Sequence, residues 1–255
     1  MVLISVVTVC KEDSVGLLKT TNSYESQLSP DTEQILVVAP SQDGSDTLAL
    51  QLSNEVTRVF IVPAKGIYNA MNYGLMQAQG RWVLFLNSGD VFVNPESLNR
   101  VIAFLNKNVT DQRSVLFSGT LSGPGREERI TPKGKITPKR FAYSLLRAIH
   151  PSILMRKDLI QELGGFSEEM KIASDYELII RALSYPTKIS EIEVAKFSLG
   201  GISTTSVRES LKEARQSRLR ALSLTPVGAF LDYFWFAYLL GRHQAKKITK
   251  CLKFF

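Results

Sequence analysis

The sequence predicts an α/β fold in which a mostly parallel sheet is flanked by helices, with a helical extension at the C-terminus. The first observation is a set of four short apolar runs without strict polar alternation, as expected of strands that are covered on both faces. The runs are LISVVTV (3–9), QILVVAP (34–40), RVFIVP (58–63) and RWVLFLN (81–87). The second observation is the helical pattern between consecutive runs, because a repeated strand–helix order favours parallel strands with right-handed crossovers.

Three helices are expected between these strands. Ser14 can cap a helix that extends to about Gln27, and a second helix follows the turn at residues 42–46. A third spans about Ile67–Gln79 and closes at a glycine. These lengths suit the crossovers of a parallel sheet.

The second half of the chain is less regular. It predicts further elements in this order: a helix at 95–106, a strand at 115–123, a charged loop or hairpin at 123–139, helices at 157–163 and 175–183, a strand at 188–198 and a basic helix at 207–224. His150 and Pro151 precede a strand-like SILM, and Pro226 separates the basic helix from an aromatic-rich segment. Residues 1–205 are therefore predicted to form one domain and residues 206–255 an extension.

Composition excludes several classes of protein. The 255 residues are 44% hydrophobic and 22% charged, as in globular proteins, so general disorder is excluded. Cys10 and Cys251 lie at opposite ends and indicate neither a metal cluster nor a disulfide framework. The first apolar run follows no basic segment and has no small-residue cleavage site, so we expect no secretory signal and a cytoplasmic location.

The net charge of +7 is confined to the C-terminal fifth. Residues 1–204 hold 21 basic and 21 acidic residues, whereas residues 205–255 hold 10 basic and 3 acidic residues. A nucleic-acid-binding domain usually carries its basic surface on its body, so we expect no nucleic-acid partner. No G-x-G-x-x-G follows the first strand, which argues against a dinucleotide-dependent dehydrogenase.

The end of the fourth predicted strand carries a candidate site. The strand runs directly into Asn87-Ser88-Gly89-Asp90. Ligands of open α/β sheets bind at the carboxyl ends of strands, and a carboxylate there can hold a hard cation between two phosphates. The alternative is that Asp90 only closes the strand in a cap or Asx-turn.

Four segments in order resemble the inverting family 2 glycosyltransferases with the GT-A fold. They are GIYNAMNYG (66–74), FLNSGD (85–90), HPSILMRKDLIQELGGF (150–166) followed by ASDYELIIR (173–181), and GGIS (200–203). The resemblance is to the bacterial branch that builds surface polysaccharides, and it covers about residues 3–205. It implies a Rossmann-like GT-A domain that moves a single sugar, of the hexosyl or N-acetylhexosaminyl class, from a nucleotide-sugar donor to a saccharide acceptor with inversion.

The resemblance also implies roles for matched positions. Donor-binding residues would be Thr8, Val9, Asn69, Asn72, Asn87 and Ser88. Asp90 would ligate Mg²⁺ or Mn²⁺, and Asp175 would be the general base. His150, Gly201 and Ser203 would lie near the donor phosphates or the acceptor. Inverting transfer needs one base for the acceptor hydroxyl and positive charge on the departing diphosphate, so two carboxylates on separate elements suit it.

Other interpretations remain open for these residues. Asp175 can cap the helix that follows it, with or without catalysis, and His150 can be structural. Glu168 and Glu169 are most simply a solvated face. Three acids usual in the family are replaced by Val38, Asn69 and Asn87, which allows an altered metal site or a catalytically inactive relative that binds nucleotide or saccharide.

The C-terminal segment favours a membrane surface. Residues 227–241 are apolar except for Asp232, and their 15 residues fall short of the roughly 18–20 that a spanning helix needs. Five cations follow: Arg242, Lys246, Lys247, Lys250 and Lys253. Aromatic residues beside cations suit an interfacial helix on anionic lipid, so we expect a peripheral protein on the inner face of the plasma membrane with a saccharide or lipid-linked saccharide acceptor. The alternative is a core-packing helix or a homodimer contact.

Overall fold

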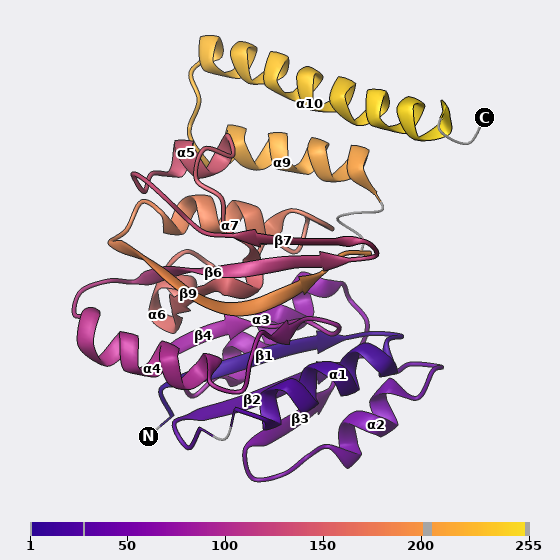
Figure 1. Ribbon diagram of the computed structural model, residues 1–255, viewed down its shortest axis with the longest axis vertical. Helices are drawn as coiled ribbons and strands as arrows, with labels where there is room; N and C mark the ends of the chain where they lie inside the picture. The colour runs from indigo at the N-terminus through magenta and orange to yellow at the C-terminus, as the bar shows by residue number, and fades with distance from the viewer. Residues whose placement is uncertain (1, 28, 201–205, 253–255) are drawn as a thin grey trace.

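The computed structural model describes residues 2–27, 29–200 and 206–252. These residues form a nine-stranded mixed sheet with helices on its faces, as the ribbon shows (Figure 1). The strands are β1 (Ile4–Cys10), β2 (Thr32–Val38), β3 (Thr57–Ile61), β4 (Trp82–Phe85), β5 (Val91–Phe92), β6 (Ser114–Gly123), β7 (Arg126–Ile130), β8 (Ile153–Arg156) and β9 (Thr187–Ser198). The helices are α1 (Ser14–Glu25), α2 (Ser45–Gln51), α3 (Ile67–Gln77), α4 (Ser97–Asn108), α5 (Pro138–Ala142), the 3₁₀ turn η1 (His150–Ser152), α6 (Lys157–Glu162), α7 (Ser174–Ala182), α9 (Val207–Ala221) and α10 (Pro226–Leu252).

The first half of the sheet is parallel, as predicted. β3, β2, β1 and β4 are neighbours in that order, and each pair runs in the same direction. Every residue of β1 and β2 is buried because helices cover both faces. On one face Val7, Ile35 and Met71 of α3 share a cluster. On the other face Leu36 packs with Leu17 of α1.

Close packing of α3 on β1 depends on Gly74. A Cβ atom built at this position would lie 2.4 Å from Cγ1 of Val7. Such a separation is well inside van der Waals contact, so any larger residue would push the helix away from the sheet. The helix end that carries GIYNAMN is thereby fixed against the strand ends.

The second half of the sheet is mixed. The order continues from β4 through β8, β6 and β9 to β5, and β7 pairs with β6 as a hairpin. β8 runs antiparallel to β4 and β6, whereas β9 runs parallel to β6. The charged segment at 123–139, predicted as a loop or hairpin, therefore begins with a hairpin. β5 and α5 were not predicted because two and five residues are too few for a periodic signal.

Two predicted helix starts were wrong by one or two residues. Asp13, rather than Ser14, caps α1, since its carboxylate accepts the N–H of Gly16 at 3.0 Å. The cap of α7 is Ala173, so Asp175 lies inside the first turn and is not the cap.

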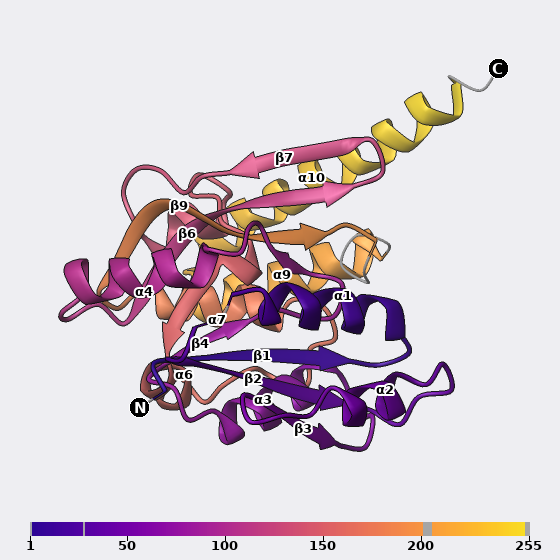
Figure 2. The ribbon, with the colours of Figure 1, turned by 60° about the horizontal axis from the view of Figure 1, so that its bottom comes forward.

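The C-terminal helices continue the helical layer. α9 packs on α7, and α10 packs on α9 as the outermost element in Figure 1. The far end of α10 extends away from the sheet in Figure 2. Within the described residues, no helix combines the length and low charge that crossing a bilayer requires.

One buried ion pair joins α9 to α10. Arg218 and Asp232 are 2% and 1% exposed, with Nη2 and Oδ2 3.3 Å apart. Tyr143 also donates to Asp232 at 3.0 Å. Asp232, the one acid in the apolar run, therefore faces inward.

Candidate functional site

The carboxyl ends of β1 and β4 lie side by side and hold the Asn87–Asp90 turn. The Ser88 N–H donates to the Val9 carbonyl at 3.2 Å. Thr8 is fully buried, and its hydroxyl donates to the Leu86 carbonyl at 2.8 Å. The Thr8 side chain thus holds the end of β4, whereas the Val9 side chain packs in the core and Val9 contacts the turn through its backbone.

Thr20 of α1 fixes the turn itself. Its hydroxyl donates to the Asp90 carbonyl at 2.7 Å and accepts the Gly89 N–H at 3.0 Å. Gly89 has a φ of +89°, a left-handed conformation that costs glycine little. Nothing in the motif singled out Thr20, because its contact is formed across 70 residues of sequence.

Asp90 is buried at this turn. Its side chain is 4% exposed and accepts the Ser198 N–H, at the end of β9, at 2.8 Å. Burial raises the pKa of Asp90 to about 7, and the Ser198 N–H only partly offsets this. The carboxylate therefore joins β9 to the turn, rather than closing its own strand in an Asx-turn.

Asn87 and Asp90 are compatible with a divalent cation. Oδ1 of Asn87 is buried and has no hydrogen-bond partner within the part of the chain that the structure describes, and a buried oxygen in this state is costly unless something binds it. The described residues contain no group of three His, Cys, Asp or Glu side chains that could hold a metal. Mg²⁺ often takes one or two protein oxygens and completes its shell with phosphates and water, so this donor set fits.

Ser88 is held by Asp13. Its hydroxyl donates to Oδ2 of Asp13 at 2.6 Å, and the same carboxylate caps α1. Nearby, Asp43 accepts the Ser14 N–H at 2.7 Å and so links the loops that follow β1 and β2. Its hydrogen bond from Ser45 lowers the pKa of Asp43 to about 2.

The predicted donor residues of α3 bind Glu168. Nδ2 of Asn69 and Nδ2 of Asn72 donate to its two oxygens at 2.8 and 2.9 Å. Asn72 also exchanges two 2.9 Å hydrogen bonds with the Phe166 backbone. Glu168 is exposed, as expected of a solvated face, but its carboxylate also clamps the start of α3.

Asp175 and His150 are brought together. Oδ1 of Asp175 accepts the Tyr68 hydroxyl at 3.1 Å, and the half-buried carboxylate also accepts the Tyr176 N–H. The His150 ring stacks on Phe85, with centroids 5.8 Å apart. Burial lowers the pKa of His150 against the opposing charge of Asp175, so the imidazole is neutral, and its Nε2 has no partner among the described residues.

A residue outside the motifs holds the backbone that precedes Asp175. Glu213 of α9 accepts the backbone N–H groups of Lys171, Ile172 and Ala173 at 3.0, 2.8 and 2.9 Å. These residues directly precede α7 and Asp175. Gly201 and Ser203 lie outside the described residues.

Comparisons with known proteins identify the family of the chain. The sequence model of Glycosyl transferase family 2 matches residues 5–164. A Mycobacterium bovis protein named PGL/p-HBAD biosynthesis glycosyltransferase is 26% identical over 214 residues, which are 81% of each chain. A Mycobacterium tuberculosis protein of the same name matches equally well.

Solved structures share the fold. The crystal structure of S. aureus TarS residues 1–349 with UDP has a TM-score of 0.66 and 22% identity, over 95% of this chain and 72% of that one. In a longer TarS structure the match spans 43% of that chain. Mannosyltransferase PcManGT from Pyrobaculum calidifontis, in complex with GDP-Man and Mn²⁺, has a TM-score of 0.63 and 15% identity, over 87% and 64% of the two chains. With a family match over more than half of its length and a GT-A-like fold, the chain belongs to glycosyl transferase family 2.

Proposed function

We propose that this glycosyltransferase moves one sugar from a nucleotide-sugar donor to a saccharide acceptor with inversion. The observation that carries the proposal is the pairing of Asp175 with a neutral His150, whose ring stacks on Phe85 two residues before the Asn87–Asp90 turn. The candidate base Asp175 and the candidate diphosphate site at Asn87–Asp90 thus both lie near the end of β4.

In this mechanism Asp175 takes the proton of the acceptor hydroxyl as that oxygen attacks the anomeric carbon. Tyr68 holds Oδ1 of the carboxylate, which leaves Oδ2 for the hydroxyl. His150 adds no charge, and its buried Nε2 is left without a partner among the described residues. Asn87 and Asp90 would hold a divalent cation, which when bound neutralises charge on the leaving diphosphate.

The test is turnover with a panel of nucleotide sugars. The panel includes UDP-GlcNAc and GDP-Man, because structurally similar proteins have been solved in complex with these nucleotide sugars. Thermal stabilisation with and without Mn²⁺ identifies the donor, and the anomeric configuration of the product reports inversion. Asp175→Asn should lower turnover by about 10²–10⁴ with donor affinity little changed; near wild-type turnover would contradict the assignment of Asp175.

A catalytically inactive relative is the second candidate. Val38, Asn69 and Asn87 stand where the family usually has acids, and Asn69 is engaged by Glu168 at 2.8 Å. Such a protein would bind a nucleotide sugar or a saccharide but would transfer no sugar, whichever divalent metal is added. Turnover of one donor would exclude it.

We also propose that the enzyme works on the cytoplasmic face of a membrane, with a saccharide or lipid-linked saccharide acceptor. Support comes from α10, whose side chains Val227, Phe230, Leu231, Phe234 and Tyr238 are 53–69% exposed. Exposed apolar residues that form a continuous stripe along a helix mark an interaction surface. A homodimer contact through the same stripe is the alternative.

A further inference from the structure

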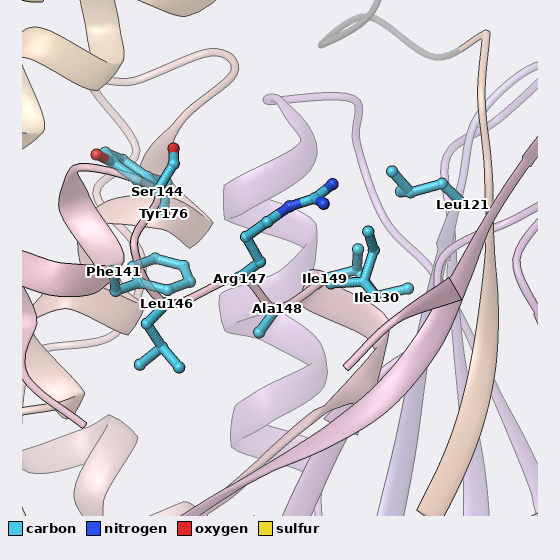
Figure 3. A pocket seen from close by; sticks show the side chains of 9 residues that line it. All are labelled: Leu121, Ile130, Phe141, Ser144, Leu146, Arg147, Ala148, Ile149 and Tyr176. Carbon is cyan, nitrogen blue, oxygen red and sulfur yellow. The ribbon is translucent and has the colours of Figure 1, made fainter. Parts of the chain in front are cut away.

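A cavity of about 250 Å³ is lined in part by Tyr176 and Ile149, the chain neighbours of Asp175 and His150. Six apolar side chains form most of its wall: Leu121, Ile130, Phe141, Leu146, Ala148 and Ile149. Figure 3 shows Phe141 and Leu146 on one side of the hollow and Ile130, Ile149 and Leu121 on the other, with Arg147 between them. None of these residues belongs to the predicted donor or metal site.

Two residues that line the cavity are adjacent in sequence to Asp175 and His150, the proposed catalytic pair. Tyr176 lines it and follows Asp175, while Ile149 lines it and precedes His150. A molecule in the cavity therefore lies against the backbone that carries both groups. This places the cavity on the acceptor side of the proposed reaction.

The wall is rigid and largely uncharged. The Tyr176 hydroxyl donates to the Ala142 carbonyl at 2.6 Å, and its ring packs on Phe141 with centroids 5.6 Å apart. Among the described lining residues the one charged side chain is Arg147, which pairs with Glu128 at 2.7 Å. A preformed apolar wall with a neutralised rim favours an uncharged apolar group.

The same loop faces α10 on its other side. Tyr143 lies between Phe141 and Ser144 in the chain, and it donates to Asp232 of α10 and packs edge-on against Trp235 at 5.9 Å. Leu145 in this loop is 63% exposed. One short segment thus lies between the cavity and the helix that carries the exposed aromatic stripe.

We propose that this cavity binds the apolar group attached to the acceptor sugar. The inference rests on the proposed function: Asp175 would deprotonate a sugar hydroxyl while a neighbouring alkyl chain or aromatic ring occupies the cavity. Drug-sized ligands occupy roughly 300–1,000 Å³, so about 250 Å³ suits a fragment such as one ring or a short chain. Apolar cavities of roughly 150 Å³ already take up benzene.

Direct binding tests the proposal without turnover. The probes are methyl, phenyl and octyl β-glucosides, each below its micelle concentration, added to the full chain with ¹³C-labelled isoleucine methyl groups. We expect Ile130 and Ile149 to shift with the phenyl and octyl probes, while Ile61, on β3 at the edge of the sheet, does not. Affinity should exceed that of methyl glucoside by about tenfold or more, since each buried methylene contributes a factor of roughly four.

Three variants localise the effect. Leu121→Gln makes the wall polar and Ala148→Leu fills the space, and each should lower phenyl and octyl affinity by about tenfold. Leu145→Gln is the matched control, because Leu145 is exposed on the same loop and does not line the cavity; its affinity should equal wild type. Preference for octyl over phenyl would assign a hydrocarbon chain, and the reverse an aromatic group.

Equal affinity for the three probes, or shifts that persist in both wall variants, would overturn the proposal. Alkyl binding that Phe234→Ser abolishes and Leu121→Gln does not would also overturn it, because the probe would then lie on α10. Failure of the proposed function is a separate result, namely absence of donor turnover, and this binding experiment does not depend on it.

Discussion

His150 is the residue whose environment most constrains the chemistry, because its buried Nε2 has no partner among the described residues and the charge of Asp175 acts on the ring. Burial lowers its pKa below the usual 6.5, with the charge of Asp175 acting in the opposite direction. Unfolding exposes the ring and restores the usual value, so below pH 6.5 the unfolded chain binds more protons than the folded one. The contribution of neutral His150 to stability is therefore complete above pH 6.5 and is lost as the pH falls below it.

We predict that His150→Gln flattens the acid side of the stability profile. The difference in the free energy of unfolding between wild type and variant should shrink as the pH falls from 7 to 5, as followed by urea denaturation. His243→Gln is the control, since His243 is the second histidine and lies on α10. Parallel profiles for wild type and His150→Gln would mean that the ring titrates normally.

Asn87 and Asn69 both stand where the family usually has acids. Their surroundings predict opposite effects when each is changed to aspartate. Oδ1 of Asn87 has no partner among the described residues, so Asn87→Asp should replace a neutral oxygen ligand by a charged one and tighten Mn²⁺ binding by about tenfold in calorimetry with nucleotide present. Asn69→Asp would place a carboxylate against Oε2 of Glu168, now 2.8 Å from Nδ2 of Asn69, and should lower the melting temperature. Unchanged Mn²⁺ affinity in Asn87→Asp would remove that position from the metal site.

At the scale of elements, α9 holds the loop before Asp175, the proposed base, through Glu213. Glu213→Ala leaves three backbone N–H groups without their acceptor, so we expect a loss of stability of about 1–3 kcal/mol. Because Asp175 follows this loop, kcat should also fall about tenfold at temperatures where the variant is folded, with donor affinity unchanged.

The controls separate positioning from stability. Glu213→Gln keeps one acceptor oxygen and should recover part of kcat, whereas the exposed Glu209→Ala on the same helix should change nothing. A fall in stability with unaltered kcat would make Glu213 purely structural.

The strands covered on both faces are the elements that the sequence identifies most directly. β1 and β2 are buried along their whole lengths, so their apolar runs identify them directly. The N-cap of α1 was misplaced because Asp13 and Ser14 are adjacent residues that can both cap a helix, and the contacts of Asp13 with Gly16 and Ser88 distinguish them only in the folded chain. Thr20 and Glu213 were missed because each serves a backbone 40 or more residues away, where no local pattern exists.

At the scale of the whole molecule, α10 combines an inward acid with an outward aromatic stripe. Asp232 pairs with Arg218 beneath the helix, while Phe230 and Phe234 are 62% and 57% exposed and pack on each other at 5.0 Å. Trp235 is half-buried against Tyr143, so the aromatic residues divide between the protein and the surface. Removing α10 would leave the buried Arg218 charge unpaired, at a cost of about 3–5 kcal/mol.

Membrane binding is therefore best tested by surface substitutions that leave this ion pair intact. We predict that the full chain sediments with vesicles of anionic lipid but not with zwitterionic vesicles, and that salt weakens binding, because apolar burial and charge attraction are both needed for more than marginal affinity. Phe230→Ser with Phe234→Ser should abolish sedimentation while the melting temperature stays near that of wild type, since both side chains are exposed. Leu50→Ser, which also removes an exposed leucine but on α2, is the control and should leave binding intact.

The opposite result would be that the double variant converts a dimer to a monomer in analytical ultracentrifugation and that wild type does not bind anionic vesicles. The stripe would then be a subunit contact, and the membrane assignment would be wrong.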